Sequence, residues 1–175
     1  MIPSSATNRN GGRPGLKKEF DLTDRRLISL LSEDGRISSR VLAERLNITQ
    51  PTVNARIRNL IQTGVLKISG LINPFKANNF IMVIVAIQVE DDKRLDEKLE
   101  QLSHLEEVHC AYVVTGRYDI FVEVVLTEGM DELYRFMSST LPELGGIRHS
   151  ESFVVMRARK KWTLMPKKAS GWDTI

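Results

Sequence analysis

The segment SRVLAERLNITQPTVNARIR, Ser39–Arg58, decides the fold of the N-terminal part of this 175-residue chain. Ala43 is small enough to stand where two helices approach each other closely. Asn47 follows at the position of a tight turn, where Asn adopts a positive φ at little cost. Val53 and Ile57 are spaced i, i+4, so they share one helix face. The segment therefore predicts two helices joined by a tight turn, a helix-turn-helix.

Residues that can cap a helix precede each of three apolar stripes in this region. Asp21 precedes the first stripe, and either Ser38 or Ser39 precedes the second. Thr49 precedes the third, with Pro51 in the first turn, where its missing N–H does no harm. The sequence thus predicts three short helices between residues 21 and 64.

Changes in composition divide the chain into five parts. Residues 1–18 are rich in Ser, Asn, Gly, Pro and basic residues, which predicts a disordered basic arm. Val65–Ser69 predicts a short strand after the third helix, and Asn73-Pro74 marks a linker. The expected boundaries are the arm at 1–18, the helix-turn-helix domain at 19–70, the linker at 71–79, a second domain at 80–160 and a basic tail at 161–175.

The second domain alternates strand and helix patterns. Four segments favour strands, and two segments with apolar residues at helical spacing lie between them. The order β-α-β-β-α-β is that of a ferredoxin-like domain, and the whole chain is therefore α+β. The predicted strands are 81–89, 108–115, 120–126 and 147–155; the helices begin near 95 and 130, and Pro142 with Gly145-Gly146 is expected to stop the second.

Composition excludes several classes of protein. Cys110 is the only cysteine, so the chain has no disulfide framework. We expect Cys110 to be a small buried hydrophobic residue. The apolar run Phe80–Val89 is about half as long as a membrane span. We expect a cytoplasmic protein with no metal and no cofactor.

The charge is unevenly distributed. Residues 1–75 hold 12 basic and 6 acidic residues, residues 76–156 hold 7 and 15, and residues 157–175 hold 6 and 1. A basic front would attract a polyanion, whereas the acidic middle would repel one. The alternative is chance variation on two solvated surfaces.

The third predicted helix has a polar outward face. Its Thr, Asn, Gln and Arg side chains can reach base edges or phosphates in a major groove. The alternative is a three-helix bundle whose polar face only meets water. The residues of this face are Pro51, Thr52, Ala55, Arg58, Asn59 and Gln62, with Gln50 and Asn54 on its flanks.

Four segments together resemble the Lrp/AsnC (feast/famine) transcriptional regulators. They are DLTDRRLI at 21–28, LAERLNIT at 42–49, VNARI at 53–57 and TGVL at 63–66. The segment TGRYDI at 115–120 resembles the Gly-x-Tyr-Asp loop of the same family. The resemblance covers about residues 20–160. It implies a winged or plain helix-turn-helix and a ferredoxin-like (RAM) domain that dimerises and binds small ligands, often amino acids.

The resemblance implies that the third helix enters the major groove of double-stranded DNA. Two roles stay open for Arg56, a phosphate contact or an intramolecular ion pair. Ser38 and Ser39 contact phosphate in one interpretation and only cap a helix in the other. The expected DNA-binding residues are Ser38, Ser39, Thr49, Gln50, Pro51, Thr52, Asn54, Ala55, Arg56, Arg58 and Asn59.

The resemblance also implies an effector site near the Gly-x-Tyr-Asp loop. Arg117 departs from the family, which often has an acidic or small polar residue there, and it could hold a carboxylate. The alternative is a hairpin turn whose Tyr118 packs at an oligomer contact. The expected effector-binding residues are Gly116, Arg117, Tyr118, Asp119, Ser150 and Ser152.

The function expected from the resemblance is sequence-specific transcription regulation in the cytoplasm, at the nucleoid. Dimers assembling into octamers would bind DNA, an amino acid would modulate them, and no membrane would be involved. Two alternatives stay open: an architectural DNA binder with little sequence preference, and an enzyme similar to siroheme decarboxylases. The second alternative rests on His104, His109, His149 and Arg148.

Overall fold

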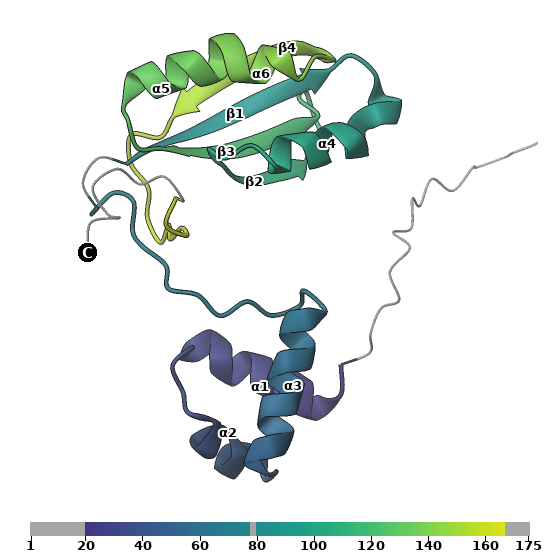
Figure 1. Cartoon of the computed structure of the whole chain (residues 1–175), viewed down its shortest axis with the longest axis vertical. Helices are drawn as coiled ribbons and strands as arrows, with labels where there is room; N and C mark the ends of the chain where they lie inside the picture. Colours follow the sequence, from purple (N-terminus) through teal and green to yellow (C-terminus); the bar gives the residue numbers. More distant parts are fainter. Residues whose placement is uncertain (1–19, 78–79, 167–175) are drawn as a thin grey trace, which may run out of the picture. The chain divides into compact units, whose positions relative to one another are not determined.

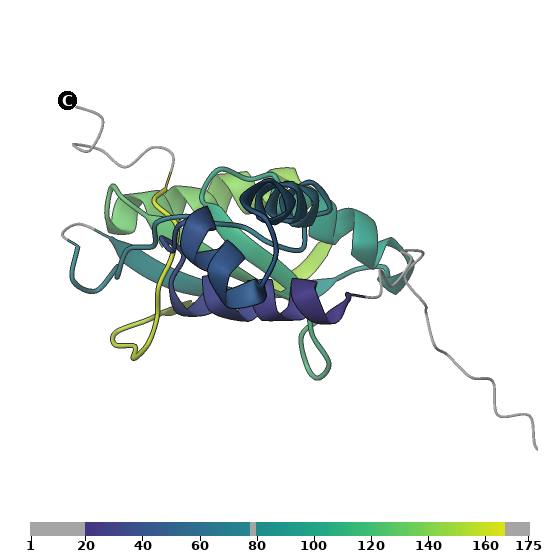
Figure 2. The same ribbon diagram turned by 90° about the horizontal axis from the view of Figure 1, so that it is seen from below.

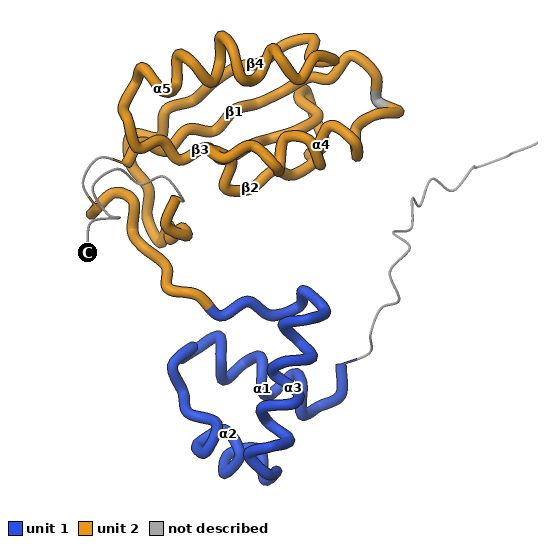
Figure 3. The backbone as a smooth tube through the Cα atoms, in the orientation of Figure 1, with its two compact units in different colours: residues 1–68 blue, residues 69–175 orange. Residues whose placement is uncertain are grey.

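The computed structural model describes residues 20–77 and 80–166. The chain divides into two compact units, residues 1–68 and residues 69–175 (Figure 3). The predicted basic arm at 1–18 and the last part of the predicted tail, 167–175, lie outside the described residues. The two units are described separately.

From residue 20 onward, where the structure describes it, the first unit consists of three helices, α1 (Leu22–Glu33), α2 (Ser39–Leu46) and α3 (Gln50–Gln62) (Figure 1). Its core is formed by one apolar stripe from each helix, as the spacing predicts. The residues at its centre are fully or almost fully buried: Leu27, Leu42, Val53 and Leu60.

The predicted caps and turn are confirmed. The carboxylate of Asp21 accepts from the amide of Asp24 at 2.7 Å, and the hydroxyls of Ser38 and Thr49 accept from the amides three residues on, at 3.3 and 3.4 Å. Asn47 ends α2 in the left-handed region, with φ 53° and ψ 48°. The helix-turn-helix therefore follows from local chemistry that the sequence displays.

The predicted strand at Val65–Ser69 is wrong. The amides of Val65 and Leu66 both donate to the carbonyl of Leu60, at 3.0 and 3.1 Å, so they close the end of α3 instead of pairing with a strand. Val65 and Ile68 keep side chains more than two-fifths exposed. A strand needs a neighbour, and the described residues of this unit supply none.

The second unit has the predicted β-α-β-β-α-β order. It contains β1 (Ile81–Val89), a 3₁₀ turn (Asp92–Arg94), α4 (Leu95–Ser103), β2 (Val108–Val113), β3 (Ile120–Leu126), α5 (Met130–Arg135), a π-helical turn (Phe136–Thr140), α6 (Leu141–Glu143) and β4 (Ile147–Val154). The strands form one antiparallel sheet in the order β2-β3-β1-β4, and the helices lie against one face of it (Figures 1 and 2). This is the ferredoxin-like arrangement.

One face of the sheet packs against the helices. Alternate residues of β1 and β3, such as Val85 and Val122, join Leu102 and Phe136 in one buried cluster. The register places the intervening residues on the opposite face. We call this opposite face the open face; its central residues are Ile84, Ala86, Cys110, Tyr112, Phe121, Glu123, Glu151 and Phe153.

Two further expectations in this unit are wrong. Cys110 is exposed rather than buried, because β2 is an edge strand and Cys110 pairs with Glu123, which points away from the helices. Pro142 does not stop the helix, since it lies in the first turn of α6, where no N–H is needed. The chain leaves the helix at Gly145 and Gly146, both with positive φ.

The beginning of the predicted tail is held in place. Ile72 and Thr163 exchange two backbone hydrogen bonds, 2.8 and 2.9 Å long, and Thr163 is buried.

Across the ranges 20–77 and 80–166, no helix is long and apolar enough to cross a bilayer. The same ranges contain no group of three or more His, Cys, Asp or Glu arranged to hold a metal ion.

Candidate functional site

The outward face of α3 is exposed as predicted. Val53 and Leu60 point into the core, which turns the polar side of the helix to solvent. The hydroxyls of Thr49 and Thr52 lie 2.8 Å apart at its first turn, so the two side chains brace each other. The exposed residues are Gln50, Pro51, Thr52, Asn54, Ala55, Arg58, Asn59 and Gln62.

Ser38 and Ser39 have different partners. Ser38 is the cap of α2, whereas the hydroxyl of Ser39 donates to Oδ1 of Asn54, on α3, at 2.6 Å. The Ser39–Asn54 bond therefore joins the two helices of the motif. The sequence carries no local signal for this bond, because its partners are 15 residues apart.

Arg56 forms an intramolecular ion pair. Its Nη1 donates to Oδ1 of Asp24 at 2.8 Å and to Oδ2 of Asp21 at 2.7 Å, and its side chain is 31% exposed. The hydrogen bond to Asp24 and then that to Asp21 raise the pKa of the Arg56 guanidinium. The Asp24 amide, and then Arg56, lower the pKa of Asp21. The structure favours the ion-pair interpretation of Arg56, which connects the start of α1 to α3.

The Gly-x-Tyr-Asp loop is fixed to the central strand. The Asp119 carboxylate accepts from the amide of Val89 at 2.9 Å, at a point where β1 shifts register against β4. The amide of Asp119 donates to Ile87, and the side chain of Gln88 donates to the carbonyl of Arg117 at 2.7 Å. Asp119, predicted as an effector acceptor, thus already accepts one hydrogen bond within the chain.

Tyr118 lies in a small polar and aromatic cluster. Its hydroxyl donates to the carboxylate of Glu151, and its ring stacks on His149 with centroids 6.4 Å apart. The Arg117 guanidinium lies 5.6 Å from the centroid of the Tyr118 ring. The hydrogen bond to Glu151 raises the pKa of Tyr118. Glu151 was not named from the sequence, and His149 was named only for the enzyme alternative, although the two-residue alternation of β4 could have placed the two on one face.

Ser150 and Ser152 face the other side of the sheet. They pair with Ile87 and Val85, whose side chains belong to the cluster under the helices. Glu151, between them, points to the open face, where it meets Tyr118. The structure therefore separates the two serines from the Tyr118 side chain.

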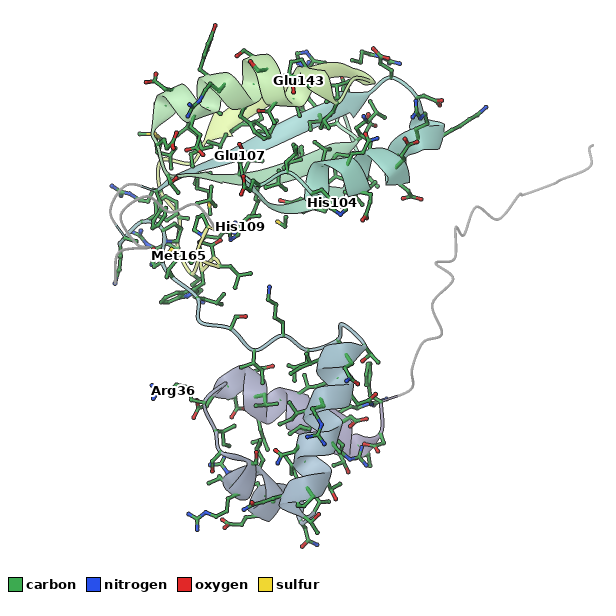
Figure 4. The ribbon with its side chains drawn as sticks, in the orientation of Figure 1. Arg36, His104, Glu107, His109, Glu143 and Met165 are labelled. Carbon is green, nitrogen blue, oxygen red and sulfur yellow. The ribbon has the colours of Figure 1, made fainter. Side chains whose placement is uncertain are left out.

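Two of the three histidines lie close together. His104 and His109 line a hollow of about 300 Å³ together with Met165 (Figure 4). His149 is on β4, at the edge of the sheet opposite to β2. The histidines that kept the enzyme alternative open thus do not meet at one site in the described residues.

Two family models match the chain. Residues 20–67 match a winged helix-turn-helix DNA-binding family, and residues 82–165 match the Lrp/AsnC ligand binding domain. An uncharacterized HTH-type transcriptional regulator of Pyrococcus abyssi is 39% identical over 83% of this chain and 91% of its own length.

Solved structures show the same architecture. The leucine response regulatory protein LrpA of Mycobacterium tuberculosis is 26% identical, covers 81% of this chain and 96% of its own, and has a TM-score of 0.70. A transcriptional regulator of Neisseria meningitidis in complex with L-Met shares the fold, at 23% identity over 84% and 96% of the chains and a TM-score of 0.65. With both units matched in order, and with the helix-turn-helix and the ferredoxin-like sheet both present, this chain belongs to the Lrp/AsnC family of helix-turn-helix transcriptional regulators.

Proposed function

We propose that this regulator binds specific DNA sites through α3 and that a small molecule, such as an amino acid, modulates the binding. The observation that carries the proposal is the exposed polar face of α3 on a helix pair whose caps and turn are fixed. In helix-turn-helix proteins the second helix of the motif lies in the major groove, and its N-terminal residues contact base edges.

The chemistry of this face suits direct readout. Gln50, Asn54 and Arg58 carry amide and guanidinium groups that match base edges, and Thr52 offers a hydroxyl. Arg58 is exposed on the outward side, so its guanidinium can reach guanine or a phosphate. Arg56, in contrast, acts within the protein and supports the angle between α1 and α3.

The open face of the sheet suits self-association. It exposes Tyr112 and Phe153, with 38% and 45% of their surfaces accessible, on strands at the two edges of the sheet. Apolar side chains grouped on an exposed face are typical of protein interfaces. A two-fold dimer would present two copies of α3 about 34 Å apart, one turn of DNA, and would read a near-palindromic site. Dimers would assemble further, up to octamers.

The loop cluster offers complementary groups for an amino acid. Arg117 can bind a carboxylate, and the carboxylates of Glu151 and Asp119 can bind an ammonium group. The structurally similar N. meningitidis regulator forms a complex with L-Met, which supports an amino-acid effector for this chain too. Because Ser150 and Ser152 face away from Tyr118, we place the effector on the open side of the loop, against Tyr118 and Glu151.

The test is binding of purified protein to genomic DNA fragments at physiological salt, with and without a panel of amino acids. A few strongly preferred fragments whose binding one amino acid changes would support the whole proposal. Preferred fragments without any amino-acid effect would contradict the effector part alone. Uniform binding to all fragments would instead support an architectural protein of the nucleoid, and no binding at all would refute the proposal and direct attention to an enzyme.

A matched pair of variants sharpens this test. Arg58→Ala removes a charge from the outward face of α3, and Arg26→Ala removes the same charge from an exposed position on α1. If α3 reads DNA, the first variant loses preference for the selected fragments and the second retains it.

A further inference from the structure

We propose that Ser39 is a positioning residue that fixes the side chain of Asn54, so that α3 presents the amide nitrogen of Asn54 to the DNA. The proposal rests on the proposed function, because it takes Asn54 to be a base contact. It adds a specificity-determining role for Ser39 and states the kind of base edge that Asn54 reads.

The first step concerns which serine caps α2. Ser38 accepts from the amide of Val41 and has the extended backbone of a cap, φ −73° and ψ 149°. Ser39 is the first residue of the helix and its hydroxyl is not used for capping. The hydroxyl is therefore available for its contact with Asn54, at 2.6 Å, and a variant that lacks it keeps the cap of α2.

The second step concerns the polarity of the contact. The Ser39 hydroxyl donates and Oδ1 of Asn54 accepts, so Oδ1 faces α2. The planar amide then directs Nδ2, with its two N–H donors, away from Ser39. Asn54 is exposed, and its donor end is the part of the side chain presented to a ligand.

The third step matches this donor to the bases. In the major groove, guanine presents two acceptors, N7 and O6, and thymine presents O4, whereas cytosine presents only the N4 donor. A free Asn can turn its amide and read adenine through one donor and one acceptor. The bond to Ser39 restrains that rotation, so Asn54 favours guanine or thymine and discriminates against cytosine at the base that it contacts.

The test is selection of bound sequences from a random duplex pool by the full-length protein. The variants are Ser39→Ala, Ser39→Thr, Asn54→Ala and Asn54→Asp, with Ser32→Ala as the control, because the hydroxyl of Ser32 donates to the carbonyl of Ile28 within α1. Asn54→Ala identifies the position that Asn54 reads. At that position the wild type is expected to favour guanine or thymine over cytosine by about tenfold, which is the size of one good base contact.

The variants separate positioning from general bracing. Ser39→Ala should lose most of the preference at that one position and keep the others, whereas Ser39→Thr retains a hydroxyl and should restore it. Asn54→Asp places a carboxylate oxygen where the amide nitrogen was, and should shift the preference toward cytosine or adenine, which carry donors. Ser32→Ala should select the wild-type site.

Three results would overturn the inference while leaving sequence-specific binding intact. One is a Ser39→Ala profile equal to the wild type at every position. Another is a uniform weakening of all positions, which would mean that the bond only braces α2 against α3. The third is a wild-type preference for cytosine at the position of Asn54. Failure of the wild type to select any sequence would instead refute the proposed function itself.

Discussion

Replacing Arg56 with alanine is expected to destabilise the helix-turn-helix unit without removing a DNA contact. Nη1 of Arg56 makes two charge-assisted hydrogen bonds, to Asp24 at 2.8 Å and to Asp21 at 2.7 Å. The Asp24 side chain is only 13% exposed, so the variant leaves a largely buried carboxylate without its cation. The Asp21 side chain is half exposed, and its pair contributes little.

The expected loss follows from these exposures. A hydrogen bond to a charged group contributes about 1.5–3 kcal/mol when protected from solvent, and an exposed ion pair contributes about 0–1 kcal/mol. Because Arg56 itself is partly exposed, we expect Arg56→Ala to lower the free energy of unfolding by about 1–2 kcal/mol. In a domain of this size each kcal/mol lowers the melting temperature by about 4–8 °C.

The assay is thermal unfolding of the full chain, followed by the helical circular dichroism signal at 222 nm, with Arg26→Ala as the control. Combining Arg56→Ala with Asp24→Asn should cost less than the sum of the two single changes, since both remove the same pair. The salt dependence of DNA binding should not change. An unchanged melting temperature together with a salt slope reduced by about 0.9 would refute the reasoning, because that slope belongs to a lost phosphate contact.

Three further predictions concern single side chains. Arg58→Ala should weaken binding to a selected DNA site more than binding to random DNA, and equal losses in a competition assay would remove Arg58 from base readout. Asp119→Ala leaves the amide of Val89 without its partner and should lower the stability of the ferredoxin-like unit by about 1–3 kcal/mol in chemical unfolding, whereas Asp119→Asn retains an acceptor and should lose less. The lowered pKa of Asp21 means that its stabilising effect is complete above its unfolded pKa, near 4, and is lost as the pH falls through the lower folded value. Asp21→Asn can still cap α1 but does not titrate, so the difference in melting temperature between it and the wild type should shrink in acid, and a constant difference would contradict this assignment.

The helix-turn-helix could be predicted because its determinants are local. Asp21, Ser38 and Thr49 are caps whose partners lie three residues away, and Asn47 adopts its left-handed turn without help from distant residues. The succession of strands and helices along the second domain was also predictable, since each strand and helix shows its own period. In both cases a pattern of a few residues contains the cause of the structure.

The wrong expectations depend on neighbours that the sequence does not show. Val65–Ser69 has the composition of a strand, but the amides of Val65 and Leu66 donate to the carbonyl of Leu60. No partner strand exists in the described part of that unit. A cysteine within an apolar strand is expected to be buried. Cys110 is exposed, because its strand lies at the edge of the sheet and its side chain points to the open face. Pairing and sheet order, which are properties of the whole domain, decide both cases.

The candidate sites show the same division. The exposed face of α3 follows from helix period, so the sequence predicted it, and the face is exposed as expected. The contacts that orient the side chains of this face, Ser39 to Asn54 and Arg56 to Asp24, join residues that are distant in sequence and appear only once the helices are packed.

The loop that holds Asp119 is hydrogen-bonded to β1, a central strand of the sheet, and the effector that we propose would act on the sheet through these bonds. The Asp119 carboxylate accepts a hydrogen bond from the amide of Val89, and the side chain of Gln88 donates one to the carbonyl of Arg117. The loop is therefore hydrogen-bonded to the last two residues of β1. β1 pairs with β3 on one side and β4 on the other. The Val89 amide uses only Oδ2 of Asp119, so Oδ1 can accept from an ammonium group. A ligand that pulled the whole carboxylate away would break the bond to Val89, at the point where β1 changes register against β4. Since Tyr118 bonds Glu151 on β4, such a ligand would alter the loop and β4 together, and with them the open face through which we propose that two copies of the chain associate.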